Sequence, residues 1–484
     1  MNWEFITSWP PILTVALVAY WIVVSIVVIT DDREPTATLA WLLVLIAFPL
    51  VGLFFYLLLG RNLKKRLMKD PWLQEILSLA APVMEPIRER FAAESAETVA
   101  WAEERDYDDV IRLITKTDGA TPLPAYDVEL LITGEAKFAA LKRDLAVAKD
   151  TIDIQYFIWE RDELTAEFTD ILLGRLAAGV EVRMLNDFVG NLGYRKDEIE
   201  RMRAGGARIL SDMTDPGKIN YRDHRKIVVI DGVLGYTGGF NVGQEYIDGG
   251  RRFPSWRDTH VRFHGPAVAE LQKLFAARWH AQTGESLFSE RFFPAHYPQD
   301  GRRTLTQIVS GGVEQPWDPA RRAHMVGFSA ARERIWIQSP YLVPTPDVYS
   351  ALLNAALSGL DVRFMMTGWP DKRVAYYAAE SFFSQLVDAG VKVYRYKKGF
   401  LHSKTMTIDG QIAVVGTMNF DIRSLALHQE LMAWFYDPEL ATRHERIYLA
   451  DIEECELVTR EMLDSWGAAH KLRNASARLA SNLL

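Results

Sequence analysis

The sequence predicts an α/β protein whose two halves repeat the same pattern behind an N-terminal pair of apolar helices. Three observations indicate this fold class: two charge-free runs at the N-terminus, short β runs that alternate with helical segments from about residue 122, and a duplicated pattern of chemically active residues. Because both halves repeat one order of strands and helices, we expect two α/β/α domains related by a pseudo-twofold axis. The predicted parts are the apolar helices (1–69), a helical linker (70–121), a first domain (122–300) and a second domain with C-terminal helices (301–484).

The composition is that of a globular chain that carries some membrane segment. The chain has 484 residues, 49% of them hydrophobic and 24% charged, and its net charge is -8. This length indicates more than one compact domain. The acidic balance argues against a general nucleic-acid binder, which is usually basic. The single cysteine, Cys455, cannot form an internal disulfide, and no Cys/His cluster has zinc spacing, so we expect no structural metal.

The two N-terminal runs predict a transmembrane helical hairpin. Residues 5–30 and 35–60 contain no charged side chain, and each run exceeds the roughly 20 residues that a helix needs to cross a bilayer. Residues 31–34 between them are enough only for a hairpin turn. Pro49 in the second run is acceptable, because neighbouring helices can satisfy the carbonyl group that a proline leaves without its helical hydrogen bond.

A cleaved signal peptide and a buried soluble helix are the competing interpretations. No Lys or Arg precedes Ile12, which disfavours the signal peptide.

Basic residues predict how the hairpin is oriented. Only Arg33 lies in the turn, whereas five basic residues follow the second run: Arg61, Lys64, Lys65, Arg66 and Lys69. By the positive-inside rule, the N-terminus and the long C-terminal part face the cytoplasm. The five charges would also attract anionic headgroups, at about 1 kcal/mol each. A plain stop-transfer role explains the same residues.

The linker predicts an amphipathic helix, and the two halves then repeat a strand, a helix and a strand. Apolar residues recur at helical spacing from Trp72 to Val83, which suits packing or contact with a membrane. The strand at 151–158 is followed by a helix and a strand at 180–185, and the strand at 334–338 by a helix and a strand at 360–365. In each half a glycine, Gly206 or Gly390, precedes another short strand.

Each half then reaches the same motif, H-x-K-x4-D-x6-G-x-x-N. The first copy contains His224, Lys226, Asp231, Gly238 and Asn241, and the second contains His402, Lys404, Asp409, Gly416 and Asn419. A single H-x-K-x4-D would be weak, because such a pattern arises by chance. Two copies with identical internal spacing, each preceded by the same strands, exclude coincidence and exclude an ordinary strand histidine.

Side-chain alternation predicts what the motif residues do. A histidine and a lysine two residues apart on a strand project from the same face. Asp231 and Asp409 each begin an Asp-Gly step, which is a hairpin-turn signal, so we interpret them as fixing the turn more than contacting a substrate. Beyond the turn, the returning strands carry Asn241 and Asn419 to the His-Lys faces.

If the two faces converge, they form one site for a group with concentrated negative charge, such as a phosphodiester. The lysines and asparagines would stabilise the charge of a five-coordinate transition state. One neutral imidazole could attack phosphorus, and the other, protonated, could give its proton to the leaving oxygen. Histidine suits both roles because its pKa is near about 6.5. The lysines supply the positive charge, so no metal and no other cofactor is required.

The paired motifs resemble the HKD motifs of the phospholipase D superfamily, and the repeat covers about residues 125–440. Residues 220–226, 236–241 and 256–262, together with the end of the apolar pair at 54–61, resemble the bacterial cardiolipin synthases. The resemblance implies two phospholipase D-like domains behind a hairpin in the bacterial inner membrane, as a multi-pass protein with its catalytic domains facing the cytoplasm.

The resemblance also implies a ping-pong reaction without a nucleotide. One phosphatidylglycerol would lose glycerol and leave its phosphatidyl group on a histidine, and a second phosphatidylglycerol would attack to give cardiolipin. The family analogy favours His224 as the nucleophile and His402 as the general acid and later base. In the wider family a carboxylate orients each imidazole, and the matching positions are Asp258 and Glu430. The implied partners are phosphatidylglycerol, other anionic phospholipids and the membrane, and no nucleic acid.

Two positions depart from the family pattern. His428 stands where the family usually has Asn, and Ser310-Gly311-Gly312 stands where Ser-Gly-Pro is usual. The motif does not choose the acceptor, so a phospholipase D-type hydrolase or another headgroup transferase, such as a phosphatidylserine synthase, stays open. A membrane anchor would keep water from the site and favours lipid-to-lipid transfer. A nuclease fits the acidic charge poorly, and an inactive scaffold fits poorly with two complete motifs.

Overall fold

A computed structural model describes residues 11–31, 35–60, 72–188, 190–191, 196–211, 221–312 and 315–479. Its contacts divide the chain into two compact units, which are described separately. One unit is residues 1–70 with 213–221, and the other is residues 71–212 with 222–484. The basic residues of segment 61–69, the turn residues 32–34 and Asn220 lie outside the described residues.

The smaller unit contains α2 (Pro11–Thr30), α3 (Pro35–Ala47), α4 (Pro49–Phe55) and the π-helix η1 (Tyr56–Gly60). Within the described residues, α2 is the one helix that is long and apolar enough to cross a membrane. It packs against α3 and α4: Val28, Leu45 and Tyr56 form a small buried cluster, and the Tyr20 hydroxyl donates to the Pro49 carbonyl at 2.7 Å. The two charge-free runs therefore contact one another.

The second charge-free run, in which Pro49 was expected to be acceptable, is interrupted just before this proline. Phe48 leaves the helical conformation, with φ -134° and ψ 72°, and α4 begins at Pro49. The cause is steric, because a proline ring disfavours the α conformation of the residue before it. The run remains helical on both sides of this break.

The larger unit is built on one 15-stranded sheet. The strands from the first half are β1 (Leu123–Leu131), β2 (Thr151–Tyr156), β3 (Glu181–Asn186), β4 (Arg208–Ser211), β5 (Ile227–Ile230), β6 (Leu234–Gly238) and β8 (His260–His264). Those from the second half are β9 (Arg303–Gly311), β10 (Arg334–Gln338), β12 (Asp361–Thr367), β13 (Lys392–Tyr396), β15 (Thr405–Ile408), β16 (Ile412–Gly416), β18 (Glu430–Tyr436) and β19 (Cys455–Leu457).

The strand order repeats outward from the centre of this sheet. β1 and β9 pair there in antiparallel fashion. The order is then β8-β6-β5-β2-β3-β4 on one side and β18-β16-β15-β10-β12-β13 on the other, with β19 added at the outer edge. In both halves the strand-helix-strand units predicted from the sequence form parallel pairs, Ile154 opposite Met184 and Ile337 opposite Phe364. These strand predictions are confirmed.

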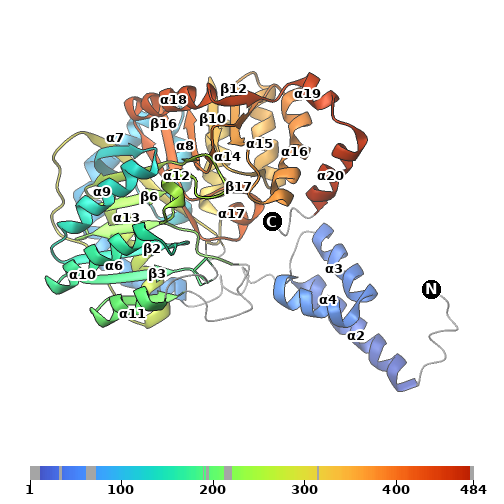
Figure 1. Ribbon diagram of the computed structural model, residues 1–484, viewed down its shortest axis with the longest axis horizontal. Coiled ribbons are helices and arrows are strands. Elements are labelled where there is room, and N and C mark those ends of the chain that lie inside the picture. Colours follow the sequence, from blue (N-terminus) through green and yellow to red (C-terminus); the bar gives the residue numbers. More distant parts are fainter. Residues whose placement is uncertain are drawn as a thin grey trace. The chain divides into compact units, whose positions relative to one another are not determined.

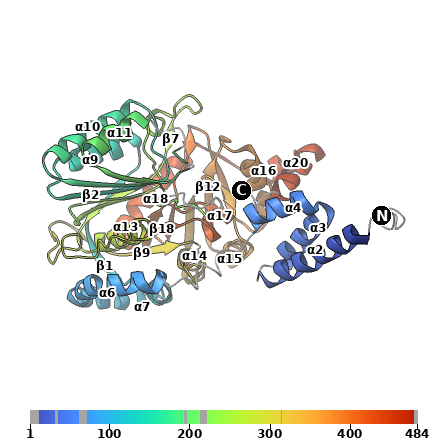
Figure 2. The ribbon, with the colours of Figure 1, turned by 90° about the horizontal axis from the view of Figure 1, so that it is seen from below.

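Helices cover both faces of the sheet in the first half. On one face lie α9 (Gly134–Ala146), α10 (Glu163–Ala177) and α11 (Lys196–Ala204), and on the other lies α13 (Val268–Thr283). Figure 2 shows these layers, with α6 (Trp72–Arg90) outside α13. Since both faces are covered, every residue of β5 is buried, as expected for strands inside an α/β fold.

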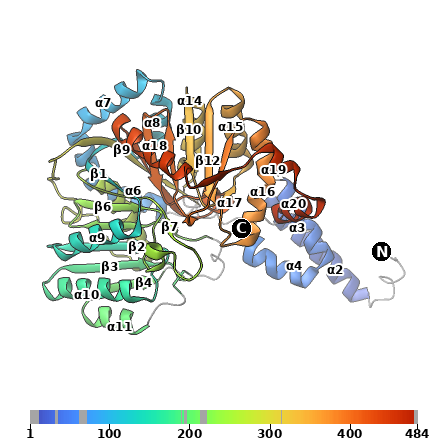
Figure 3. The ribbon, with the colours of Figure 1, turned by 45° about the horizontal axis from the view of Figure 1, so that its top comes forward.

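The second half has the same kind of helices. They are α14 (Pro319–Ala330), α15 (Pro346–Leu357), α16 (Arg373–Asp388) and α18 (Pro438–Ile452), and β15 is buried throughout. The C-terminal helices α19 (Arg460–Asp464) and α20 (Ala468–Leu479) pack against α16 (Figures 1 and 3). The two halves lie on either side of the β1–β9 pair (Figure 3).

Residues 72–118 are helical, as α6, α7 (Ala92–Glu103) and α8 (Asp108–Asp118). α6 contributes Ala80, Met84 and Ile87 to the core that also contains α13. α8 contributes Val110 and Ile114 to the core of the second half, beside α14. This segment is therefore part of the folded unit and packs on both halves.

Candidate active site

The two His-Lys pairs stand at corresponding places in the fold, directly before β5 and β15. All four side chains are buried: His224 and His402 are 7% and 9% exposed, and Lys226 and Lys404 are 0% and 1% exposed. Burying four basic side chains next to one another is costly unless partners compensate. For each histidine, the partner comes from the opposite half.

Each histidine is bonded through its Nδ1 atom to a carboxylate of the other half. His224 Nδ1 lies 3.1 Å from Glu430 Oε2 and 3.2 Å from the Thr417 carbonyl oxygen. His402 Nδ1 lies 2.7 Å from Asp258 Oδ2. The two carboxylates that the family resemblance assigned to this role thus contact the histidines, and the contact is exchanged between the halves.

Backbone hydrogen bonds fix the same exchange. The His224 amide donates to the Gln429 carbonyl at 2.9 Å, and the His402 amide donates to the Arg257 carbonyl at 2.7 Å. Just before His402, the short strand β14 (Phe400–Leu401) pairs in parallel with β7 (Trp256–Arg257). Each histidine is therefore held, by main chain and side chain, against the segment that carries its carboxylate.

The lysines are cations in a buried setting. Lys226 Nζ donates to the His224 carbonyl at 2.7 Å, and Lys404 Nζ donates to the His402 carbonyl. Burial lowers the pKa of Lys226 to about 7, against the opposing attraction of Glu430, and Lys404 lowers it further. Burial likewise lowers the pKa of Lys404 to about 8, with Asp258 opposing. Because charges from both halves act on each lysine, the two motifs share one electrostatic environment.

Burial favours the neutral form of both imidazoles. Burial lowers the pKa of His224 well below its usual value, and Lys226 lowers it further. Burial and then Lys404 lower the pKa of His402 to about 4, although Asp258 acts in the opposite direction. Since a carbonyl oxygen only accepts hydrogen bonds, the Thr417 carbonyl requires a proton on Nδ1 of His224. The Nε2 atom of His224 then carries a free lone pair.

Asp231 and Asp409 stand in the turns, as predicted. Both residues have φ 53°, the left-handed conformation that Asp tolerates in a turn. The Asp231 carboxylate accepts from the backbone N–H groups of residues 149, 150 and 151, at 2.9, 2.8 and 3.0 Å. The Asp409 carboxylate accepts from those of residues 332, 333 and 334, at 2.7, 2.8 and 2.7 Å. Both carboxylates thus tie the turn to the strand before it.

The two asparagines differ in their contacts. Asn241 Oδ1 accepts from the Ile158 amide at 3.2 Å, and its Nδ2 donates to the Tyr246 hydroxyl at 3.1 Å. Asn419 is buried at 7% exposure, and its Oδ1 has no hydrogen-bond partner among the described residues. Both follow the turn as predicted, but Asn241 is engaged inside its own half.

Sequence reasoning did not assign a role to three residues around the histidines, although it noted His428 as a departure from the family pattern. The Thr417 hydroxyl donates to Glu430 Oε2 and accepts from the Leu431 amide at 3.0 Å. At the equivalent position Gly239 leaves room for Asp258, since a Cβ there would lie 1.9 Å from Asp258 Oδ1. The His428 ring centre lies 6.1 Å from that of His224. The sequence signal that could have identified Thr417 and Gly239 is that each directly follows the glycine of its motif.

Two models of known protein families match different parts of the chain. The sequence model of the family described as "Cardiolipin synthase, PLD-like domain" matches residues 327–452. A second one, described as "Phospholipase_D-nuclease N-terminal", matches residues 19–61. The first match contains the second motif, and the other lies on the apolar helices.

Several curated proteins are similar over nearly the whole chain. A "Cardiolipin synthase" of Alkalihalophilus pseudofirmus is 35% identical over 491 residues, which cover 99% of this chain and 95% of that protein. A "Cardiolipin synthase" of Geobacillus sp. (strain WCH70) is 34% identical, covering 95% and 91%. A "Cardiolipin synthase 2" of Bacillus cereus is 35% identical, covering 95% and 89%.

Among solved structures, the crystal structure of a phosphatidylserine synthase from Haemophilus influenzae Rd KW20 has a similar fold. The TM-score is 0.57 at 14% sequence identity, and the match covers 78% of this chain and 100% of that one. At this level of identity the likeness concerns the fold alone.

Proposed function

The chain belongs to the bacterial cardiolipin synthases of the phospholipase D superfamily, and from its site we infer that the two histidines carry a phosphatidyl group between two lipids. The enzyme is a phosphatidyltransferase. In the proposed reaction, two phosphatidylglycerol molecules give cardiolipin and glycerol. The observation that carries this proposal is the reciprocal pairing of His224 with Glu430 and of His402 with Asp258.

In the first step, the Nε2 lone pair of His224 attacks the phosphorus of phosphatidylglycerol. A nitrogen-phosphorus bond forms, and the bond from phosphorus to the glycerol headgroup oxygen breaks. His402, protonated at Nε2, gives its proton to that oxygen and becomes a neutral imidazole. Glycerol is the leaving group. Lys226 and Lys404 stabilise the negative charge on the non-bridging oxygens during the transfer.

In the second step, a hydroxyl group of the second phosphatidylglycerol attacks the phosphohistidine. Its proton passes to Nε2 of His402, the new phosphorus-oxygen bond forms, and the bond to His224 breaks. His402 is thereby protonated again, and His224 recovers its lone pair. One phosphodiester replaces another, so the reaction needs no nucleotide.

The different surroundings of the two histidines support this assignment of roles. Burial raises the pKa of Glu430 to about 8, so the partner of His224 stabilises a positive imidazolium poorly, and His224 suits the neutral nucleophile. The 2.7 Å contact of His402 with the Asp258 carboxylate stabilises an imidazolium, which suits the acid. A phosphodiester between the lysines adds negative charge, which raises the pKa of His402 toward neutrality.

We also propose that the halves are related by a pseudo-twofold axis through the β1–β9 pair. This proposal is supported by the matching strand orders on the two sides of that pair and by the exchanged carboxylates. Such an axis gives one site with two equivalent faces. A reaction that transfers a phosphatidyl group in two similar steps, between two similar lipids, can use such a site.

The enzyme would bind its lipid substrate at the surface of a membrane. One N-terminal helix, α2, has the length and composition to span a bilayer. A hairpin completed by α3, α4 and η1 is supported by the absence of charge from residue 35 to 60 and by the packing of Val28 on Leu45. With the basic residues after it, this hairpin would place the catalytic domains on the cytoplasmic side of the inner membrane.

The proposed function is tested with one lipid. The purified full-length enzyme is incubated with phosphatidylglycerol alone, and the products are separated by lipid chromatography and glycerol assay. Cardiolipin and glycerol in equal amounts are expected. Formation of phosphatidic acid without cardiolipin would instead assign the site to hydrolysis.

A further inference from the structure

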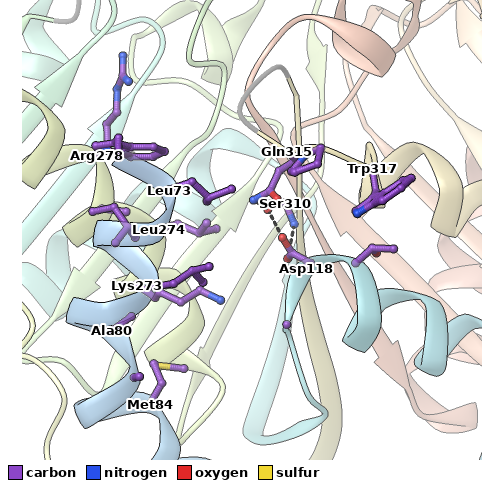
Figure 4. A pocket seen from close by; sticks show the side chains of 18 of the residues that line it. Leu73, Ala80, Met84, Asp118, Lys273, Leu274, Arg278, Ser310, Gln315 and Trp317 are labelled. Carbon is purple, nitrogen blue, oxygen red and sulfur yellow. Dashed lines mark hydrogen bonds between the residues drawn. The ribbon is translucent and has the colours of Figure 1, made fainter. Parts of the chain in front are cut away.

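A groove of about 520 Å³ lies outside the histidine site, between α6 and α13 on one side and the ends of α8 and β9 on the other (Figure 4). Neither His224 nor His402 lines it. Arg225 lines it at one end, and because side chains alternate along an extended chain, Arg225 projects away from its neighbours His224 and Lys226. The volume is within the range of about 300–1,000 Å³ that is typical of ligand sites.

The wall formed by the two helices is apolar. It consists of Leu73, Ile76, Ala80 and Met84 from α6 and Leu274 and Ala277 from α13. Figure 4 shows Leu73, Ala80, Met84 and Leu274 together on this wall, opposite Trp317. Two large apolar side chains at the groove are strongly exposed, Leu77 at 54% and Trp317 at 60%. These two side chains leave apolar surface accessible at the groove.

Positive charge lines the same groove. Five basic side chains, Arg88, Lys116, Arg225, Lys273 and Arg278, face two acidic ones, Glu85 and Asp118. Behind the lining, Glu270 pairs with Lys273 and with Arg88, and Asp223 pairs with Arg225 and lies 3.7 Å from Arg278. The basic side chains outnumber the acidic ones even when these two are included.

Asp118 is held by hydrogen bonds at the groove. Its carboxyl group accepts from the Ser310 amide at 3.0 Å (Figure 4), and burial raises its pKa, against the attraction of Lys273. The Gln315 side chain donates to the Ser310 hydroxyl at 2.8 Å. The groove therefore offers an apolar wall, a polar cluster at Asp118, Ser310 and Gln315, and, once the two acidic residues behind the lining are counted, one more basic than acidic side chain.

We propose that this groove binds one acyl chain of an anionic phospholipid, whose phosphate lies at Arg278. The apolar wall fits the chain, and the Arg278 guanidinium complements the charge of the headgroup. The choice of a lipid rests on the proposed function. It is also consistent with the sequence, because α6 is the first helix that the structure describes after the apolar helices.

Such a lipid would contact the residues that hold His224. Arg225 donates to Gln429 Oε1 at 2.6 Å, and the carbonyl group of Gln429 accepts from the His224 amide. The headgroup end of the groove thus contacts Arg225, whose partner Gln429 holds the backbone of His224. A lipid in the groove is separate from the two lipids that react.

Cysteine accessibility provides the test, because Cys455 is the only cysteine of the chain. Full-length Cys455→Ala protein receives one new cysteine in the groove, by Ala277→Cys. The matched control is Ala177→Cys on α10, at an exposed position outside the groove. Both proteins are reconstituted in phosphatidylcholine vesicles, with and without phosphatidylglycerol, and the rate of labelling by a water-soluble maleimide is measured.

Phosphatidylglycerol is expected to slow labelling at position 277 and not at position 177. In the Arg278→Gln protein, half-maximal protection should require about tenfold more phosphatidylglycerol, because one charge-assisted hydrogen bond is lost. Arg278→Lys keeps the positive charge and should lose less of the protection. Equal labelling with and without phosphatidylglycerol would overturn the inference, as would unchanged protection in Arg278→Gln.

The outcome separates this inference from the proposed function. Protection by phosphatidylglycerol in an enzyme that forms no cardiolipin would retain the groove and reject the reaction. Cardiolipin formation without any protection at position 277 would retain the reaction and reject the groove.

Discussion

His402 Nδ1 lies 2.7 Å from Oδ2 of Asp258, a residue 144 positions earlier in the chain and in the other half of the fold. The reciprocal pair, His224 and Glu430, is separated by 206 positions. Each half therefore supplies a histidine and the carboxylate for the other histidine. Neither half contains a complete catalytic unit, and the chemistry depends on how the halves are packed.

The first prediction concerns Asp258→Asn. The amide can still accept the Nδ1 proton of His402, but it cannot stabilise the imidazolium, so kcat should fall by about 10²–10⁴. Steady-state formation of cardiolipin gives kcat, and thermal unfolding checks that the fold is retained. A kcat close to that of the unchanged enzyme would show that the carboxylate has no part in proton transfer.

The second prediction concerns Gly239→Ala, a change of one methyl group. The new Cβ would lie 1.9 Å from Asp258 Oδ1, so the carboxylate must leave its place beside His402. Activity should fall as far as in Asp258→Asn. Thr417→Ser is the matched control in the other half, because it keeps the hydroxyl group that donates to Glu430, and it should stay active. Full activity of Gly239→Ala would mean that the position of Asp258 is not critical.

The third prediction separates Asp231 from the histidines. Asp231→Ala removes an acceptor of three backbone N–H groups, which should lower the free energy of unfolding by about 1.5–3 kcal/mol or more. The melting temperature should fall, and the protein that remains folded should keep most of its kcat. Complete loss of kcat at an unchanged melting temperature would assign Asp231 a chemical role.

The fourth prediction concerns pH. The lysines must be protonated to bind an anionic phosphodiester, and the pKa values of Lys226 and Lys404 in the free enzyme are about 7 and about 8. Because kcat/KM reports the free enzyme, it should fall as pH rises through this interval, with a smaller effect on kcat. Lys226→Arg keeps its charge at higher pH and should move the decline upward. A profile of kcat/KM that stays flat through this interval would contradict this electrostatic account.

Much of the fold was predictable because it repeats. The strands before the first motif, 151–156 and 181–186, and their counterparts in the second half follow from alternation and from the spacing of the two motifs. The turn roles of Asp231 and Asp409 followed from Asp-Gly steps. These features depend on residues that are near one another in the sequence, where local chemistry determines the conformation.

Contacts between distant residues were not predictable from the motif. Nothing in the sequence says that Glu430 serves His224 and Asp258 serves His402, since that depends on the packing of the two halves. The break at Phe48 was a different case: the signal, a proline at position 49, was visible, but its steric effect on the preceding residue outweighed the helical tendency of the run.

The most direct test of the central claim is to identify the atom that carries the phosphatidyl group. The enzyme is mixed rapidly with phosphatidylglycerol and denatured at alkaline pH during turnover, and its peptides are analysed by mass spectrometry. The account predicts a phosphatidyl adduct on the peptide that contains His224, and no adduct in His224→Ala. An adduct on His402, or no covalent intermediate during steady formation of cardiolipin, would contradict it.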